Sequence, residues 1–284
     1  MPFAICDGIS TRYEVLGKGP ALLMFAPGGF NATIEQWSAL GIYAKIKPLE
    51  WLTQHYTCIV FDRRECGQSG GRVERVTYDH FVTHAVALLD HLKIEKAHIM
   101  GGCMGCCPVA AMGIGAPERV KSMLLWWPVG GAKYRISSHQ RMAQHLAYVE
   151  QKGMQGVVDL VKETGKPFNA DPRGGPWASV LIHDAAFAAG YARLDGERYR
   201  ALAAGMIRTL FDRDTAPGAE PEDMLQCDLP ALIVPGNDAN HATSAARFLE
   251  ECLPKSEYWD MMVSGQTREA SEKRVLEFLG QHNS

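Results

Sequence analysis

The sequence predicts an α/β fold, in which a mostly parallel sheet carries helices on both faces and a helical insertion. Short apolar runs alternate with segments of helical period through the first 128 residues. This alternation stops near residue 129 and returns near residue 226. One apolar run leads directly into a glycine-rich turn that opens a helix, at residues 98–107. These observations predict one sheet domain encoded in two pieces of sequence.

The first piece supplies most of the expected sheet. Its strands are predicted at residues 21–27, 57–62, 96–100 and 121–127. Its helices are predicted at residues 34–53, 78–92 and 105–115. Pro48 is expected to interrupt the first of these helices, because proline has no backbone N–H to donate.

The rest of the chain first loses and then regains strand character. Helical segments are expected at residues 137–151, 156–164, 176–189 and 197–213. Strands return at residues 229–234 and 256–263, and helices at residues 243–252 and 268–281. We therefore predict a core formed by residues 1–128 and 226–284, with residues 129–225 inserted as a helical lid.

Composition and charge argue against several classes of protein, namely nucleic-acid-binding, membrane-spanning and secreted proteins. The 284 residues are 46% hydrophobic and 21% charged with a net charge of −3, so no basic surplus favours nucleic acid or anionic membranes as partners. No apolar run approaches the roughly 18 residues of a membrane span. The first residues do not resemble a secretion signal, and the eight cysteines are expected to be reduced thiols. We expect a cytoplasmic protein that acts on a small molecule; a homo-oligomer is compatible with the sequence.

The glycine-rich turn presents a cysteine. Cys103 lies between Gly101 and Gly105, where an apolar strand meets a helix. A turn this sharp strains its central residue and leaves no space for side chains two positions away. It also sets the thiol at a helix N-terminus, which lowers a cysteine pKa. Cys103 is therefore the candidate nucleophile; the alternative is a packed cysteine without catalytic function.

Four motifs in this order resemble the α/β-hydrolase superfamily. The first is the turn around Cys103, with the form of a nucleophile elbow that carries a thiol in place of the usual serine. The others are the strand end at residues 27–30, the Asp-x-Arg stretch at residues 61–69 and the strand end at residues 235–238. The resemblance covers nearly all of the chain and implies an α/β-hydrolase fold with a lid.

The resemblance also implies roles for particular residues. The backbone N–H of Met104, which follows the nucleophile, would be one donor of the oxyanion hole. Gly29 would supply the second donor, with Phe30 the next candidate. Asp238 would be the acid of a catalytic triad. Both glycine and aspartate also occur in ordinary turns at such positions.

The general base is where the sequence departs from the family. The family has a histidine after its last strand, but here Gln266 stands in that loop, and no histidine lies between His241 and His282. In a serine enzyme, loss of the base costs on the order of 10⁶-fold in turnover. A thiol ionises more readily and needs the base less for attack. His241, three residues after Asp238, either meets the sulfur or caps the following helix.

Glu65 is a second departure, because it replaces a glycine of the Asp-x-Arg stretch. Dienelactone hydrolases, another cysteine branch of the superfamily, use a glutamate near their thiol. By that resemblance Glu65 would act as a base or influence the ionisation of Cys103. The alternative is a surface glutamate beside Arg63 and Arg64.

Two pairs of residues have the spacing of a metal site or a redox site, and we interpret both pairs as structural. His80 and His84 lie four residues apart on a predicted helix but have no evident third ligand, so we expect no metal. Cys103 and Cys106 form a Cys-x-x-Cys pair, which could be a redox site. Packing of Cys106 inside the helix is the simpler interpretation, and no cofactor is expected.

The leading hypothesis is a cofactor-independent thiol hydrolase or acyl transferase. Cys103 would attack an activated carbonyl of an ester, thioester or lactone, with Asp238 and either His241 or Glu65 handling protons. Amides are expected to be poor substrates, because the leaving amine must be protonated and the usual acid is missing. The alternative is an altered α/β-hydrolase-fold protein that binds a small molecule or performs non-hydrolytic lyase chemistry.

Overall fold

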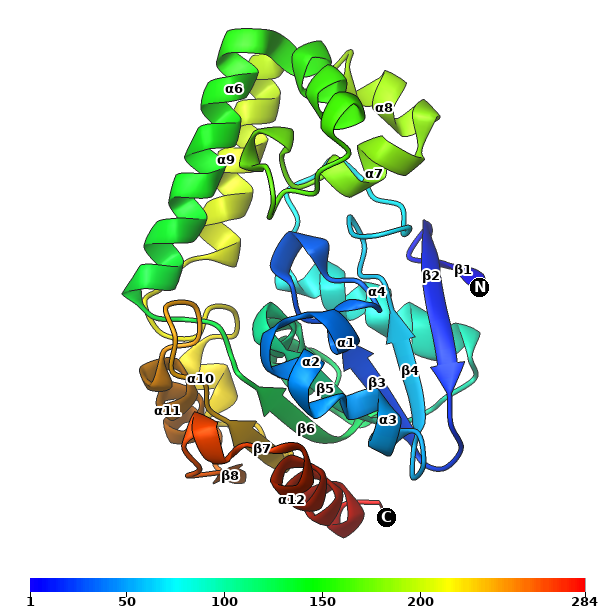
Figure 1. Ribbon diagram of the computed structural model, residues 1–284, viewed down its shortest axis with the longest axis vertical. Coiled ribbons are helices and arrows are strands. Elements are labelled where there is room, and N and C mark those ends of the chain that lie inside the picture. Colours follow the sequence, from blue (N-terminus) through cyan, green and yellow to red (C-terminus); the bar gives the residue numbers. More distant parts are fainter. Residues whose placement is uncertain (284) are drawn as a thin grey trace.

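A mostly parallel sheet forms the centre of the molecule (Figure 1). The computed structural model describes residues 1–283. The strands are β1 (Phe3–Cys6), β2 (Ile9–Leu16), β3 (Ala21–Phe25), β4 (Thr57–Phe61), β5 (Ala97–Gly102), β6 (Val120–Trp126), β7 (Ala231–Val234) and β8 (Ser256–Tyr258). They form one eight-stranded sheet in the order β1-β2-β4-β3-β5-β6-β7-β8. From β4 to β8 every neighbouring pair is parallel, which confirms the predicted fold class.

The first two strands were not predicted. They form an antiparallel hairpin that adds to the edge of the sheet through β2 and β4. Its turn is Asp7-Gly8, where φ is 51° and 71°. Positive φ at both central residues is the requirement of a type I′ turn, and Asp-Gly is its typical sequence. The signal for this hairpin was therefore present in the chain.

Seven helices, in two groups, cover the faces of the sheet. They are α1 (Gln36–Ala39), α2 (Gly41–Ile46), α3 (Pro48–Leu52), α4 (Tyr78–His91), α5 (Cys106–Gly115), α11 (Thr243–Cys252) and α12 (Arg268–Gln281). Leu23 and Phe25 of β3 pack in the cluster with α4, α5 and α11, whereas Leu22 and Met24 pack with α1–α3 and α12. Apolar side chains on both faces are typical of buried parallel strands.

The segment between β6 and β7 forms a helical layer beside the sheet (Figure 1). Its helices are α6 (Ala132–Thr164), α7 (Ala178–His183), α8 (Ala185–Tyr191), α9 (Gly196–Leu210) and α10 (Pro221–Met224). A break at Gly153, where φ is 69°, divides α6 as the two predicted segments suggested. Helix α10 differs from the rest, because Met224 packs into the core cluster with α5 and α11.

Single 3₁₀ turns occur at several loop positions. They are η1 (Gly29–Asn31), η2 (Cys103–Gly105), η3 (Pro117–Arg119), η4 (Pro172–Gly174) and η5 (Val263–Gly265). Strand β8 is shorter than predicted, and η5 begins at Val263, the last residue expected in that strand. Among residues 1–283, every helix is too short or too polar to cross a membrane.

Candidate active site

The backbone at Cys103 has the conformation of a nucleophile elbow. Its φ is 56°, at the point where β5 passes through η2 into α5. A Cβ atom at Gly101 would lie 2.3 Å from the carbonyl oxygen of Gly105, and one at Gly105 would lie 2.3 Å from that of Phe25. Both positions therefore require glycine because the chain approaches itself so closely. The turn directs the Cys103 side chain into a cavity.

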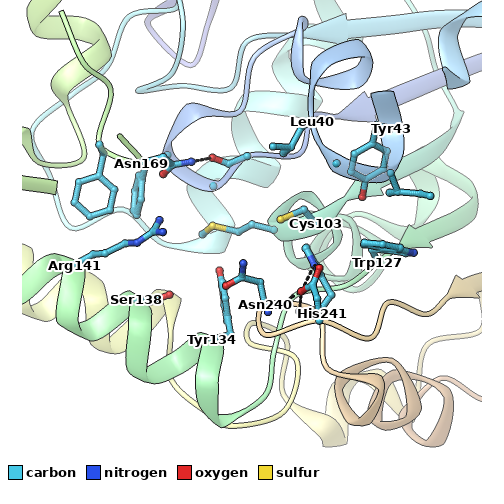
Figure 2. Close-up of a pocket in the computed structure, with 18 of the residues that line it drawn as sticks. Leu40, Tyr43, Cys103, Trp127, Tyr134, Ser138, Arg141, Asn169, Asn240 and His241 are labelled. Atoms are coloured by element: carbon cyan, nitrogen blue, oxygen red, sulfur yellow. Dashed lines mark hydrogen bonds and ion pairs between the residues drawn. The ribbon is translucent and has the colours of Figure 1, made fainter. Parts of the chain in front are cut away.

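That cavity has a volume of about 380 Å³ and lies between the sheet and the lid (Figure 2). It is lined by Gly28, Gly29, Phe30, Leu40, Gly41, Ile42, Tyr43, Cys103, Met104, Trp127, Tyr134, Ser138, Arg141, Phe168, Asn169, Phe211, Asp238, Asn240 and His241. Its size is that of a small-molecule site. Cys103, Met104, Gly29, Asp238 and His241, five of the residues singled out in the sequence, all line it.

Asp238 and His241 form a hydrogen-bonded pair. Nδ1 of His241 donates to the Asp238 carboxylate, at 2.8 Å from Oδ1 and 2.9 Å from Oδ2. The backbone N–H groups of Asn240 and His241 donate to the same carboxylate at 2.8 and 3.0 Å. Nε2 of His241 is buried and has no hydrogen-bond partner of normal geometry among the described residues. Asp238 therefore holds the ring through Nδ1, and Nε2 is available to a group in the cavity.

Contacts of the backbone fix this histidine in place. The N–H of Gly130 donates to the Asn240 carbonyl at 3.0 Å, which joins the end of β6 to the loop after β7. A Cβ atom at Gly236 would lie 2.6 Å from the Cβ of His241 and 3.1 Å from the Trp127 ring. Glycine at this position therefore makes room for the imidazole beside the sheet.

The electrostatics couple Cys103 to His241. Burial acts to raise the pKa of the Cys103 thiol, but its interactions with His241 and with the N–H groups of Gly28 and Met104 outweigh burial, so this pKa is lowered overall. Burial acts to lower the pKa of His241, yet Cys103 and Asp238 raise it to about 9. Burial also opposes ionisation of Asp238, but its hydrogen bonds lower that pKa. The site favours a thiolate beside an imidazolium.

Two backbone N–H groups interact with the sulfur and are candidates for an oxyanion hole. They belong to Met104 and Gly28, and Gly29 lines the cavity next to them. Arg63 Nη2 donates to the Gly29 carbonyl at 2.6 Å, and Asn169 Nδ2 donates to the Gly28 carbonyl at 2.5 Å. These two side chains hold the carbonyl groups of the turn from the core and from the lid. The arrangement is suited to binding a developing negative charge.

Gln266, which stands where the family has its histidine, is buried and fully bonded. Its Nε2 donates to the carbonyl groups of Pro235 at 2.8 Å and Met261 at 3.2 Å. Its Oε1 accepts from Nε1 of Trp127 at 2.8 Å. The Trp127 ring lies 5.4 Å from the His241 ring, centroid to centroid. Gln266 therefore supports Trp127 at the wall of the cavity, whereas the imidazole of the site is that of His241 in the loop after β7.

The proposal that Glu65 acts on the thiol is corrected by its position. Its carboxylate accepts from Nε of Arg64 at 3.0 and 3.1 Å, and from the Arg72 N–H at 3.4 Å. The residue is 2% exposed and lies outside the cavity lining. The surface alternative was also wrong, because Glu65 is a buried partner of Arg64. Its φ of 66° lets the side chain turn back to that arginine.

The surrounding Asp-x-Arg stretch organises the loop below the oxyanion turn. Asp62 accepts hydrogen bonds from the N–H groups of Ile34 and Gln68, both at 2.9 Å. Ser69 Oγ donates to the Asp62 carbonyl at 2.7 Å. This closed set of contacts positions the adjacent Arg63, and through it the turn that faces Cys103.

The paired histidines on α4 have separate structural partners. His84 is buried, and its Nε2 lies 2.7 Å from Oγ1 of Thr11. His80 Nδ1 accepts from the N–H of Thr77 at 3.1 Å and closes the start of the helix. Their rings are thus engaged in packing and capping.

The second cysteine of the Cys-x-x-Cys pair is also engaged elsewhere. Cys106 Sγ lies 3.1 Å from the carbonyl oxygen of Gly101 and is buried. Burial raises its pKa well above the ordinary value. All eight cysteines are free thiols.

Sequence analysis missed the polar residues of the helical insertion that complete the cavity, which are Ser138, Arg141 and Asn169. Tyr134, Ser138 and Arg141 follow one another along one face of α6, and Asn169 comes from the loop after it. Their spacing of four and three residues is the signal of a shared helical face. That face is polar as well as aromatic, so it gave no clear apolar stripe in the sequence.

The sheet order, the elbow and the lid define an α/β-hydrolase-fold protein. Residues 22–162 match the family model described as "alpha/beta hydrolase fold". Over 98% of both chains, a hydrolase from Pseudomonas aeruginosa superposes with a TM-score of 0.64 at 20% identity. The enol-lactonase from Burkholderia xenovorans gives a TM-score of 0.62 at 18% identity, over 98% of this chain and 100% of that one. The chain therefore has the α/β-hydrolase fold.

Two curated proteins show more limited likeness. The first is the dihydrolipoyllysine-residue acetyltransferase component of the acetoin cleaving system of Cupriavidus necator, 32% identical over 45% of this chain and 32% of that protein. The second is the 2-hydroxy-6-oxo-6-(2'-aminophenyl)hexa-2,4-dienoic acid hydrolase of Metapseudomonas resinovorans, 23% identical over 83% of this chain and 73% of that protein. The chain therefore spans about a third of the first relative.

Proposed function

We propose that the protein is a cofactor-independent thiol hydrolase or acyl transferase that acts on an activated ester, thioester or lactone. The observation that carries this proposal is the Asp238–His241 pair beside Cys103 in one cavity. It supplies a nucleophile, a proton carrier and an orienting carboxylate in the relation of a catalytic triad. The triad differs from the usual one because its acid and its base come from the same loop.

The proposed reaction has two stages. The Cys103 thiolate adds to the carbonyl carbon, and the resulting oxyanion is held by backbone N–H groups that include that of Met104. Collapse of this intermediate breaks the bond to the leaving group, which takes the proton of the His241 imidazolium. This leaves a thioester on Cys103. Neutral His241 then accepts a proton from water, or from an acceptor alcohol or thiol, which attacks the thioester and releases the sulfur.

His241 changes one expectation about substrates. Amides were expected to be poor because no acid was evident for the leaving amine. An imidazolium with a pKa of about 9 is such an acid. The argument against amides therefore loses its basis, and amides belong in the substrate panel with the activated esters.

The first experiment is turnover of a panel of thioesters, aryl esters and lactones. A lactone is a reasonable member because an enol-lactonase shares the fold. We expect Cys103→Ala to abolish turnover and His241→Gln to lower kcat at least 100-fold, the lower range for loss of a general acid–base group. Cys252→Ala, which removes a thiol far from the cavity, is the matched control. Turnover that survives in Cys103→Ala would contradict the proposal.

A trapped intermediate provides a second test. In His241→Gln the thioester on Cys103 is expected to accumulate, because its hydrolysis needs the base. Intact-protein mass spectrometry after mixing with substrate should show the added acyl mass in this variant, and peptide mapping should place it on Cys103. Normal turnover in His241→Gln would exclude this histidine from the mechanism.

A further inference from the structure

The lid end of the cavity contains a cation that the proposed chemistry does not use. Arg141 lies on α6 and lines the cavity together with Ser138, one turn earlier on the same helix. Figure 2 shows its guanidinium reaching into the cavity from the side opposite Trp127, with Cys103 between them. The Cys103 sulfur and this cation therefore lie apart within one cavity.

Arg141 has no acidic partner within salt-bridge distance in the described part of the chain. The acid that lines the same cavity, Asp238, is already bound to His241. By contrast, Arg135 on the same helix pairs with Asp214 at 3.1 Å. The guanidinium remains charged at every relevant pH. The cavity thus holds one fixed positive charge without a partner.

The walls around this charge are mostly apolar. Phe30, Phe168 and Phe211 line the cavity and are buried. Arg141 itself is exposed, so water partly screens its charge, and its selectivity for an anion comes from the shape of the guanidinium as well as from that charge. The planar guanidinium fork also matches a planar carboxylate, which it can hold by two parallel hydrogen bonds. A phosphate dianion would leave one charge without compensation at a single arginine.

We propose that the substrate carries a carboxylate at the end remote from its scissile carbonyl, and that Arg141 binds this carboxylate. This inference rests on the proposed function and specifies its substrate class. Ser138 lies one helical turn away and supplies a hydroxyl donor at the same end. Binding at Arg141 would set the carbonyl over Cys103, so this arginine determines specificity and takes no part in bond breaking.

Affinity labelling tests the inference without requiring turnover. The probes are N-bromoacetyl derivatives of glycine, β-alanine and 4-aminobutyrate, each compared with its primary amide, which has the same shape and no charge. In every case the Cys103 thiolate displaces bromide. For the best chain length we expect the carboxylate probe to label Cys103 about 10- to 100-fold faster than its amide, the range for a hydrogen-bonded charge.

Two variants separate Arg141 from the general charge of the site. Arg141→Gln should bring the carboxylate probe down to the rate of its amide and leave the amide rate unchanged. Arg135→Gln, which removes an arginine of the same helix outside the cavity, should preserve the preference. Equal rates for the two probes in the unmodified protein, or a preference that survives Arg141→Gln, would overturn the inference.

Turnover distinguishes this inference from the proposed function. Thioesters that end in a carboxylate are compared with those that end in the matching primary amide. We expect Arg141→Gln to lower kcat/KM for the first kind about 10- to 100-fold more than for the second kind. If both kinds are hydrolysed equally, the proposed function stands and the carboxylate inference fails. If neither is hydrolysed, the proposed function loses support and the labelling experiment still decides the role of Arg141.

Discussion

At the scale of single residues, the histidine of this site lies in the loop after β7, and Gln266 occupies the loop where the resemblance to α/β-hydrolases places a histidine. His241 lies three residues after Asp238 and bonds to it directly, whereas Gln266 braces Trp127 and two carbonyl groups. A base in the loop after β7 can meet the elbow because Gly236 leaves space beside it. The loop after β8, which contains Gln266, then serves to support the structure of the site.

One prediction follows for Gln266. Because its amide bonds away from the cavity, Gln266→His in the His241→Gln background should restore no activity, measured as kcat/KM for the best thioester. The single variant Gln266→Leu should lower the free energy of unfolding by about 2 kcal/mol, since it leaves the Trp127 N–H and the Pro235 carbonyl without their partner. Recovery of a tenth of normal activity in the double variant would show that the usual base position still works.

A second prediction concerns Gly236. A methyl group here would meet the Cβ of His241 at 2.6 Å, so Gly236→Ala must displace the imidazole. We expect kcat to fall at least tenfold, because small misplacements of catalytic groups are costly. Gly190→Ala in α8, where a methyl group meets nothing within 4 Å, is the matched control. Unchanged kcat in Gly236→Ala would mean that the position of His241 is unimportant.

At the scale of elements, the helical segment between β6 and β7 is connected to the turn at Gly28 and Gly29, which we propose as part of an oxyanion hole. Asn169, in the loop after α6, donates to the carbonyl of Gly28, while Arg63 holds the carbonyl of Gly29 from the core. The turn that faces the sulfur is therefore fixed from two sides. A loop that was predicted only as a connection between helices of the lid contributes to the site.

We expect Asn169→Ala to lower kcat about tenfold, less than the loss of a whole oxyanion donor, because the turn loses one support and keeps the other. The rate of Cys103 alkylation by iodoacetamide should not change, since that reaction forms no oxyanion. The control is Gln155→Ala, an exposed amide on α6. A parallel fall in alkylation would indicate general disruption of the cavity and contradict this role for Asn169.

The elements that sequence predicted well are those with strong local signals. Helices α11 and α12 begin and end where residues 243–252 and 268–281 were expected, and the elbow glycines were recognised from their spacing. The geometry of the site was harder to predict, because the orientation of a loop side chain depends on contacts with residues that are distant in the sequence. The contact of Gly130 with the His241 loop and the hydrogen bond from Arg63 to the Gly29 carbonyl are of this kind.

At the scale of the whole molecule, buried histidines make stability depend on pH. Burial lowers the pKa of His84 to about 3, and those of His98 and His145 to about 4. Below the unfolded value near 6.5 the unfolded chain binds protons that the native protein does not, so stability falls as pH falls. Each histidine should contribute a loss of about 2 kcal/mol between pH 6.5 and 5.

Urea unfolding at pH 7, 6 and 5 measures this effect. We expect the free energy of unfolding to decrease steadily over this range, and the decrease to be smaller in His84→Gln. A flat profile between pH 7 and 5 would show that these histidines are protonated in the native protein or are not buried.

The most direct test of the account is the rate at which iodoacetamide alkylates Cys103 between pH 5 and 10, in the unmodified protein and in His241→Gln. His241 is the main reason why the pKa of Cys103 is lowered in spite of burial. We predict rapid labelling of the unmodified protein at neutral pH, with an apparent pKa below that of an ordinary cysteine thiol. In His241→Gln burial should raise that pKa above the ordinary value and slow labelling at neutral pH. Identical profiles for the two proteins would contradict the claim that Cys103 and His241 form the catalytic pair.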